Sequence, residues 1–307
     1  MHWLWTVELH WRQATLLAAA VAAVSVTLRR VRPRRWTSFA AGLTTEVAII
    51  LVLYALWQVA GSLSVSHIGG AMSRGRSLWD LERTLHLPSE RWMQAQLLPH
   101  RALVQGANAY YALLHAPPLA VFLVWLFVWH RDRYASVRNV IVLLTGTCLL
   151  IQLIPVAPPR LEASLHMVDT ARLLGQSVYG SIGTGISDQL SAMPSVHIGW
   201  SVLIGWYAVR LGRSPWRWLV LTHPAVMSIV VVVTANHYWL DGIVAVGVLV
   251  AAIGVEAAAS ALVRWSRRRP AAVAPRRAGA DAAPPGSPAP PPASVSTPSL
   301  ATTSAED

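Results

Sequence analysis

Two short polar clusters, each at the start of a long apolar run, carry the residues best suited to chemistry. The first is P-S-V-H at residues 194–197, and the second is H-Y-W-L-D at residues 237–241. Proline is tolerated near a helix start and serine is a good N-cap, so we expect His197 in a first helical turn. Free backbone N–H groups and the helix dipole attract anions there. His237 and Asp241 are four residues apart, so on a helix they share one face and can hydrogen-bond.

These residue types together predict chemistry on a phosphate. A carboxylate that holds an imidazole fixes its tautomer and raises its basicity. A histidine can then attack phosphorus, while an acid protonates the leaving oxygen and cations or N–H donors hold the equatorial oxygens. His237 has the layout of the nucleophile and Asp241 that of its orienting residue, with His197 as the acid. Arg160 can hold two phosphate oxygens at once, and Ser195 adds a donor.

The composition of the chain indicates the class of protein that carries these residues. The 307 residues are 54% hydrophobic and 13% charged, with a mean hydropathy of +0.44. Such a chain is too apolar for an ordinary soluble domain, and several runs are long enough to cross a bilayer. We therefore expect an all-α integral membrane protein, a helical bundle of about six core transmembrane helices plus one extra N-terminal span. The spans are expected at about residues 15–28, 39–63, 107–129, 139–156, 195–209, 218–235 and 238–263.

The segments outside the spans have different compositions. Residues 64–106 are too polar to span, and leucines mixed with charged residues at 72–98 predict an interfacial helical segment. The tail at residues 270–307 contains mostly Pro, Ala, Ser and Thr, cannot build a core and is expected to be disordered. We therefore divide the chain into an N-terminal span with a basic loop at 1–38, a membrane domain at 39–265, and the tail.

Several function classes are excluded or disfavoured by composition. The single cysteine, Cys148, excludes an internal disulfide and a cysteine-based zinc site. The chain contains no lysine, so neither a lysine Schiff base nor a lysine phosphate clamp is available. The net charge of +11 is compatible with nucleic acid binding, but the arginines flank apolar runs, which favours a role in membrane topology instead.

Two polar residues inside the predicted spans receive structural interpretations. Glu46 is interpreted as a partner for a neighbouring arginine or helix rather than as a catalytic group. Asn108, Tyr111 and His115 recur at helical spacing and share one face, and His115 is interpreted as an interhelical hydrogen-bonding residue.

The P-S-V-H and H-Y-W-L-D elements resemble the P-S-x-H and H-x-x-x-D elements of the type 2 phosphatidic acid phosphatase superfamily, which includes vanadium haloperoxidases. The resemblance covers roughly residues 40–265. The common pattern also has a lysine, an Arg-Pro pair and an arginine six residues before the second histidine; here Val231 occupies that last position. With P-P-R at residues 158–160, the motifs look more like the inositol phosphorylceramide synthase branch.

This resemblance implies a membrane-embedded phosphatase or phosphotransferase that acts on a lipid phosphate, diphosphate or phosphodiester without a cofactor or metal. It implies the same roles for His237, Asp241 and His197, and a phosphate-binding role for Arg160. Arg172 and Asp188 have no counterpart in the motifs and remain weaker candidates for the site.

Two other classes of protein are compatible with the sequence. A metal-dependent membrane hydrolase would use His197, His237 and Asp241 as ligands, since two histidines and a carboxylate form a known ligand set. No further acidic cluster accompanies them, and an arginine-rich phosphate site competes with a cation. A small transporter or membrane scaffold is the non-enzymatic alternative, although no repeat relates the two halves.

Arginine placement predicts the topology. Of the 25 basic residues, 17 lie at residues 29–36, 130–138, 210–217 and the C-terminal flank, which alternate with the other loops if the chain has seven spans. The positive-inside rule places this set in the cytoplasm. Arg160, His197 and His237 then fall at the outer face of the plasma membrane.

We therefore expect a reporter fused after Arg269 to lie in the cytoplasm, because the flanking arginines resist translocation. Paired fusions to a fluorescent protein and to an exported phosphatase measure this. Activity of the exported phosphatase alone would place the C-terminus outside the cytoplasm and would move the site to the cytoplasmic face.

Overall fold

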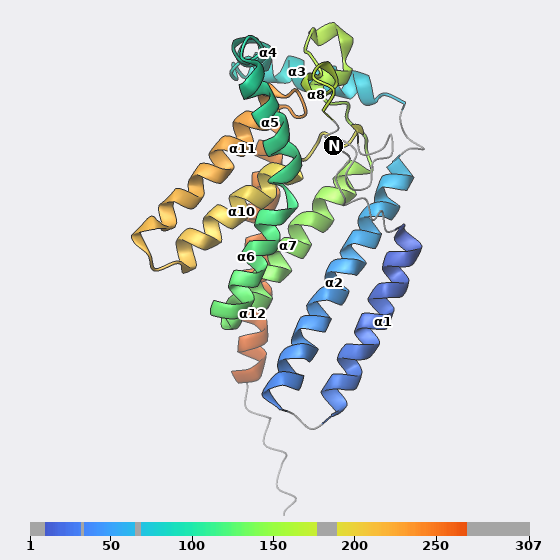
Figure 1. Ribbon diagram of the computed structural model, residues 1–307, viewed down its shortest axis with the longest axis vertical. Coiled ribbons are helices and arrows are strands. Elements are labelled where there is room, and N and C mark those ends of the chain that lie inside the picture. Colours follow the sequence, from blue (N-terminus) through green and yellow to red (C-terminus); the bar gives the residue numbers. More distant parts are fainter. Residues whose placement is uncertain (1–9, 32–33, 65–68, 177–188, 269–307) are drawn as a thin grey trace, which may run out of the picture. The chain divides into compact units, whose positions relative to one another are not determined.

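The described part of the protein is built from helices. A computed structural model describes residues 10–31, 34–64, 69–176 and 189–268 (Figure 1). The α-helices are α1 (Trp11–Arg30), α2 (Arg35–Ser64), α3 (Ala71–Thr84), α4 (Glu90–Leu97), α5 (Arg101–Leu113), α6 (Ala116–Trp129), α7 (Arg131–Gln152), α8 (Thr170–Leu173), α10 (Val196–Leu211), α11 (Thr222–Val233) and α12 (Trp239–Arg268). Short 3-10 helices are η2 (Pro159–Leu161), η3 (Ala163–Leu165) and η4 (Pro215–Leu221). The predicted all-α fold class is confirmed.

The chain separates into two compact units, Met1–Arg264 and Trp265–Asp307. Most of the second unit, including the tail predicted to be disordered, lies outside the described residues. The division of residues 1–265 into an N-terminal part and a membrane domain stays a prediction.

The helices of the first unit include candidate membrane spans. By length and hydropathy, five described stretches can cross a membrane: Trp11–Arg30, Arg35–Val59, Arg131–Gln152, Pro215–Val233 and Trp239–Arg267. The pair α5 and α6 adds a sixth if it forms one span bent by 47°. The seventh expected span corresponds to α10, which has only 16 residues, whereas a straight span needs about 20. Helices α3 and α4, in the segment predicted to be interfacial, are not among the candidate spans.

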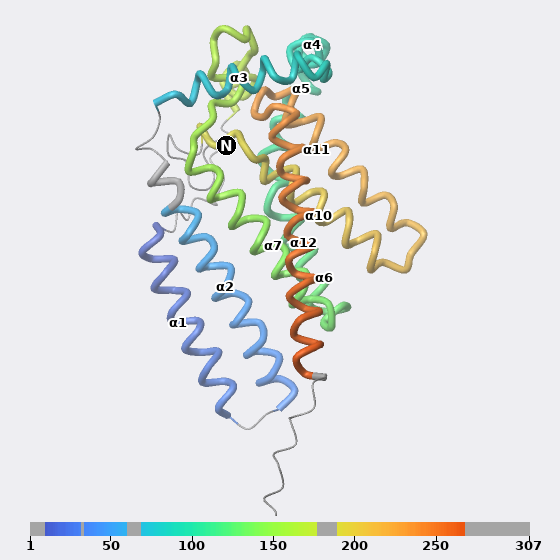
Figure 2. The backbone as a smooth tube through the Cα atoms, turned by 180° about the vertical axis from the view of Figure 1, so that it is seen from behind, coloured from blue at the N-terminus to red at the C-terminus, as the bar shows by residue number. Residues whose placement is uncertain are grey.

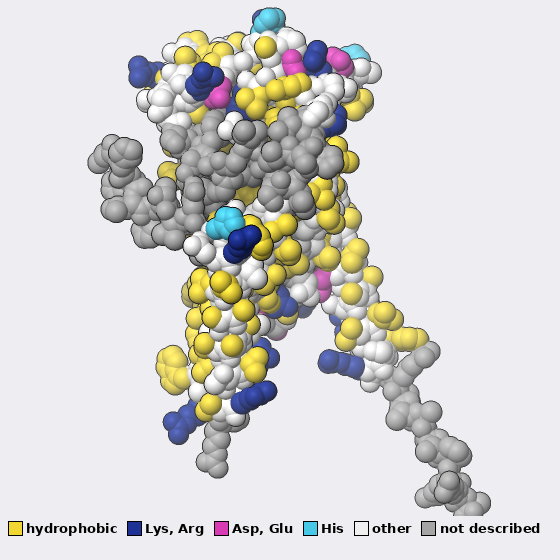
Figure 3. Space-filling view, turned by 90° about the vertical axis from the view of Figure 1, so that its right-hand side faces the viewer, with side chains coloured by type: hydrophobic (Ala, Val, Ile, Leu, Met, Phe, Trp, Pro, Cys, Tyr) yellow, Lys and Arg dark blue, Asp and Glu magenta, His cyan; other side chains and the backbone are white. Residues whose placement is uncertain are grey.

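The centre of the first unit is a packed apolar core. Leu126 of α6, Leu144 of α7, Leu203 of α10 and Leu249 of α12 are at most 2% exposed and belong to one cluster. Other large apolar side chains of the same helices point outward; Val121 and Val250, for example, are 70% and 64% exposed. Figure 3 shows apolar side chains covering much of one face. An apolar exterior around an apolar core is what a lipid-embedded protein requires, so the chain is an integral membrane protein.

Helices α1 and α2 form a hairpin that lies beside the central helices (Figure 2). Ser25 donates to the Ala41 carbonyl at 2.9 Å, which shows how closely the two backbones approach. The contact with α7 contains a polar group: Arg138 donates to Glu46 at 2.7 Å, and the Tyr134 hydroxyl donates to the same carboxylate at 3.2 Å. The interpretation of Glu46 as a structural partner of an arginine is therefore confirmed.

The loop after α7 holds the segment before α10. Val156 forms a single parallel β-bridge with Ser191, in which the Ala192 N–H donates to the Val156 carbonyl at 3.2 Å. Helix α3 packs against the same loop, where Arg74 donates to the Pro155 carbonyl at 2.6 Å. Gly75 permits this close approach, because a Cβ there would lie 2.7 Å from the Ala157 carbonyl oxygen. The non-spanning helices and two loops thus form one support for residues 192–197.

Replacing Glu46 with alanine should destabilise the protein, because Arg138 would keep its charge at a largely buried helix contact without its carboxylate partner. Removing one partner of a buried ion pair costs about 3 kcal/mol. Thermal unfolding in detergent measures the effect. Asp132→Ala is the matched control, since the Asp132–Arg133 pair is mostly exposed and should contribute little. Equal melting temperatures for the two variants would contradict a stabilising role for Glu46.

Candidate active site

His237 lies in a tight reversal between α11 and α12. The Val231 carbonyl accepts from both the Asn236 and His237 backbone N–H groups, at 3.0 and 3.1 Å. Ala235 has a φ of +58°, which a residue with a Cβ adopts only at some cost. Helix α12 begins at Trp239, so His237 precedes the helix rather than lying on it with Asp241, as the four-residue spacing had predicted. The reversal nevertheless brings the two side chains together.

The imidazole of His237 is held through one nitrogen. Its Nδ1 lies 2.7 Å from the Ala192 carbonyl oxygen and 3.3 Å from Asp241 Oδ2. A carbonyl and a carboxylate only accept hydrogen bonds, so Nδ1 carries the hydrogen. The neutral ring then has its lone pair on Nε2. The side chain is 7% exposed, so this arrangement is buried and fixed.

Asp241 also starts a helix. Its Oδ2 accepts the Tyr238 backbone N–H at 2.8 Å, the reach-back bond of a capping box. Its carbonyl accepts the Ser195 N–H at 3.0 Å, which joins the start of α12 to the start of α10. The side chain is completely buried, and its Oδ1 has no hydrogen-bond partner among the described residues. One carboxylate therefore caps α12 and holds His237 in place.

The start of α10 follows the prediction. Ser195 is its N-cap and accepts the Ile198 N–H at 3.4 Å, so His197 lies in the first turn. The ring centroids of His197 and His237 are 5.7 Å apart. Ser195 is completely buried and its hydroxyl oxygen serves the cap, so a contact with substrate stays a prediction.

Aromatic rings surround His197. Tyr111 stacks on it at 4.3 Å, and the His115 ring centroid lies 3.9 Å away. His115 in turn stacks on Trp200 at 4.6 Å. The structure therefore brings a third histidine to the two that the motifs predicted, from the point where α5 and α6 meet.

Arg160 is joined to the site through its backbone. Its N–H donates to the Ala235 carbonyl at 3.0 Å, beside the reversal that carries His237. Its side chain is 4% exposed and pairs with Asp169 at 3.7 Å. Arg172 is exposed, and its backbone N–H donates to the same aspartate, which caps α8. Asp188 lies outside the described residues.

Two carboxylic acids of the non-spanning helices lie near the start of α12. Glu82 of α3 accepts the Leu240 N–H at 2.7 Å, and Glu90 of α4 accepts from Arg83 at 2.7 Å. Both side chains are completely buried. Burial and a hydrogen bond to Glu90 raise the pKa of Glu82 to about 9. Glu82 is therefore protonated at neutral pH and donates to Glu90, which satisfies an oxygen of each carboxyl group.

Sequence reasoning missed three groups that complete this arrangement. The Ala192 carbonyl, the nearest partner of His237, has no side-chain signal at all. Glu82 lies far along the chain from Leu240, whose N–H it accepts. Asp169 lies close in sequence to Arg160, but no motif pairs the two residues. The sequence places Glu82 among leucines and other charged residues of the predicted interfacial segment. That pattern does not show which of the acids is buried.

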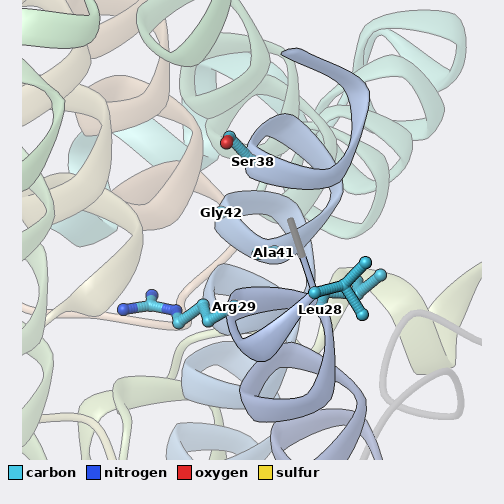
Figure 4. Close-up of a pocket in the computed structure, with 6 residues that line it drawn as sticks. Leu28, Arg29, Ser38, Ala41 and Gly42 are labelled. Carbon is cyan, nitrogen blue, oxygen red and sulfur yellow. The ribbon is translucent and has the colours of Figure 1, made fainter. Parts of the chain in front are cut away.

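No candidate residue lines the pocket shown in Figure 4. It has a volume of about 250 Å³ between α1 and α2 and is lined by Leu28, Arg29, Val31, Ser38, Ala41 and Gly42. Across the described residues, no three His, Cys, Asp or Glu side chains are grouped so that they could hold a metal ion.

Apolar helices and a buried histidine held by a carboxylate define a membrane protein with a candidate phosphate site. A family model described as the PAP2 superfamily matches residues 76–255, more than half of the chain, so the chain belongs to this superfamily. Membership supports a phosphatase-type function on lipid phosphates. Comparison with curated proteins and with solved structures gave no match.

The raised pKa of Glu82 predicts a pH-dependent stability difference. Between about pH 4.5 and 9 the folded protein retains a proton that the unfolded chain releases, so the free energy of unfolding falls as pH rises. Glutamine mimics the protonated acid and cannot titrate. Glu82→Gln should therefore gain melting temperature relative to the unchanged protein as pH rises from 5 to 8, at roughly 2–4 °C for each kcal/mol.

Melting in detergent across this range measures the difference. Asp80→Asn, an exposed change on the same helix, is the control and should follow the unchanged protein. If the curve for Glu82→Gln also ran parallel to that of the unchanged protein, Glu82 would be ionised in the folded state.

Proposed function

We propose that the chain is a lipid phosphate phosphatase or phosphotransferase that works through a phosphohistidine at His237. The observation that carries this proposal is the environment of the Nδ1 atom, where two acceptors fix the hydrogen and leave Nε2 with its lone pair. A buried carboxylate beside the ring stabilises the positive charge that the imidazole gains when Nε2 bonds to phosphorus.

The reaction has two displacements at phosphorus. In the first, His237 Nε2 forms the P–N bond as the P–O bond to the leaving group breaks, and His197 gives its proton to the departing oxygen. In the second, His197 takes a proton from water or an alcohol, whose oxygen attacks phosphorus and releases the histidine. Arg160, buried near the reversal, supplies positive charge toward the equatorial oxygens.

The substrate is a lipid phosphate, diphosphate or phosphodiester at the outer face of the plasma membrane. Arginine distribution supports this side of the membrane, and the exposed apolar surface of the helices supports a substrate that arrives through the lipid. The motif resemblance to the inositol phosphorylceramide synthase branch supports an alcohol as a possible acceptor in place of water. Assays that follow released phosphate and new lipids together separate hydrolysis from transfer.

Replacing His237 with alanine should abolish turnover, because no other described group is held as a nucleophile in this way. Asp241→Asn should be severe but less complete, since loss of an orienting carboxylate costs less than loss of the nucleophile. Rapid quenching with a phosphate-labelled substrate should trap an acid-labile, base-stable adduct in the unchanged protein. Full activity of His237→Ala protein at normal expression would end this mechanism.

The variant His197→Ala tests whether His197 is the acid that protonates the leaving group. It should slow substrates with poor leaving groups most, because a good leaving group needs no proton. The chelator EDTA separates the proposal from a metal-dependent hydrolase, since it should leave phosphohistidine catalysis intact. Lipid uptake without any chemical change would instead indicate a transporter.

A further inference from the structure

His115 is a half-buried histidine with a buried Nδ1 atom that neither the fold nor the proposed mechanism explains. Its ring contacts His197 at a centroid distance of 3.9 Å and Trp200 at 4.6 Å. Its Nδ1 is buried and has no hydrogen-bond partner among the described residues. The interhelical hydrogen bond expected from the sequence is therefore absent at this atom. A buried polar atom without a partner costs free energy, so its presence points to a bound group.

Helix capping does not account for this histidine. His115 is the residue before α6, and a capping side chain accepts from the backbone N–H of the second or third helical residue. Those residues are Pro117 and Pro118, which have no N–H. The side chain makes no capping hydrogen bond, so its ring nitrogens remain available to a ligand.

The position of His115 is fixed by packing. It lies at the break between α5 and α6, which are bent by 47° relative to one another, and Figure 1 shows this break beside α10. Contacts with Trp200 and His197 restrain the ring plane. Breaks in membrane helices are where transport proteins place ligand sites, since unpaired polar groups are tolerated there only when they face a ligand or cavity.

A phosphoryl group in transfer carries spread negative charge on three equatorial oxygens and needs several donors. Arg160 is the buried arginine attached to the reversal, and Asp169 already shares its charge at 3.7 Å. Part of the Arg160 charge is therefore already used by Asp169. A histidine that touches the proposed acid lies within reach of the same substrate.

We propose that His115 is a third histidine of the active site and donates a ring N–H to a phosphoryl oxygen of the lipid substrate. This proposal rests on the proposed function. It assigns His115 a contact with the substrate itself, separate from the proton that His197 delivers to the leaving group. The contact also satisfies a nitrogen that is otherwise unpaired in a buried place.

The experiment compares His115→Phe with His115→Gln in purified protein. Phenylalanine keeps a ring between His197 and Trp200 but has no N–H, whereas glutamine keeps an N–H donor. Orthovanadate and inorganic phosphate serve as probes of the phosphoryl site, and kcat/KM is measured on lipid phosphates with good and poor leaving groups. His130→Phe is the matched control, because His130 also precedes a helix and contacts a tryptophan, Trp125 at 4.4 Å.

We expect His115→Phe to weaken inhibition by orthovanadate and to lower kcat/KM by about 10- to 100-fold, as for a lost charged hydrogen bond. The loss should be equal for good and poor leaving groups, His115→Gln should recover part of it, and His130→Phe should match the unchanged protein. Unaltered orthovanadate inhibition in His115→Phe, or a loss confined to poor leaving groups, would overturn the proposal. Inactivity of the unchanged protein on every lipid phosphate, with no orthovanadate binding, would instead refute the proposed function.

Discussion

The rest of the site depends on the hydrogen bonds of one buried carboxylate, Asp241. The same oxygen accepts the N–H that starts α12 and lies beside Nδ1 of His237. The carbonyl of Asp241 accepts the N–H of Ser195, which caps α10. Because these bonds share one residue, the starts of α10 and α12 and the imidazole of His237 are held together. The cap on α12 and the proposed role of Asp241 as an orienting residue therefore rest on the same geometry.

Residues of α3 and of the loop that follows it support the start of α12, which carries this carboxylate. Glu82 accepts the Leu240 N–H from outside α12, and the Trp239 indole donates to the Pro88 carbonyl at 2.9 Å. Burial raises the pKa of Glu82, and the neutral form of this acid lowers the repulsion that two ionised carboxylates would exert on Asp241. The non-spanning helices α3 and α4 thus act as an electrostatic support as well as a packing surface. Two acids of this charged segment, Glu82 and Glu90, are therefore fully buried, whereas Asp80 on the same helix as Glu82 is exposed.

Sequence predicted the parts of the site whose signals are local. The cap at Ser195 and the closeness of His237 to Asp241 followed from short spacings, and Glu46 was correctly interpreted as an arginine partner. Other features depend on residues far apart in the chain or on backbone atoms, as with the Ala192 carbonyl, and no residue type announces them. The break before α6 had a local signal, since two prolines follow His115, but the apolar pattern on both sides favoured one continuous span.

Several buried polar atoms in this region have no hydrogen-bond partner among the described residues, and most of them have a structural explanation. A shared proton accounts for the unpaired oxygens of Glu82 and Glu90, and Arg74 already donates to a carbonyl through another nitrogen. Asp241 Oδ1 belongs to a carboxylate whose other oxygen has donors. His115 differs from all of these, because no hydrogen bond to either of its ring nitrogens comes from the described residues. An unpaired buried atom of this kind calls for a specific explanation, and this one belongs to a ring in contact with His197.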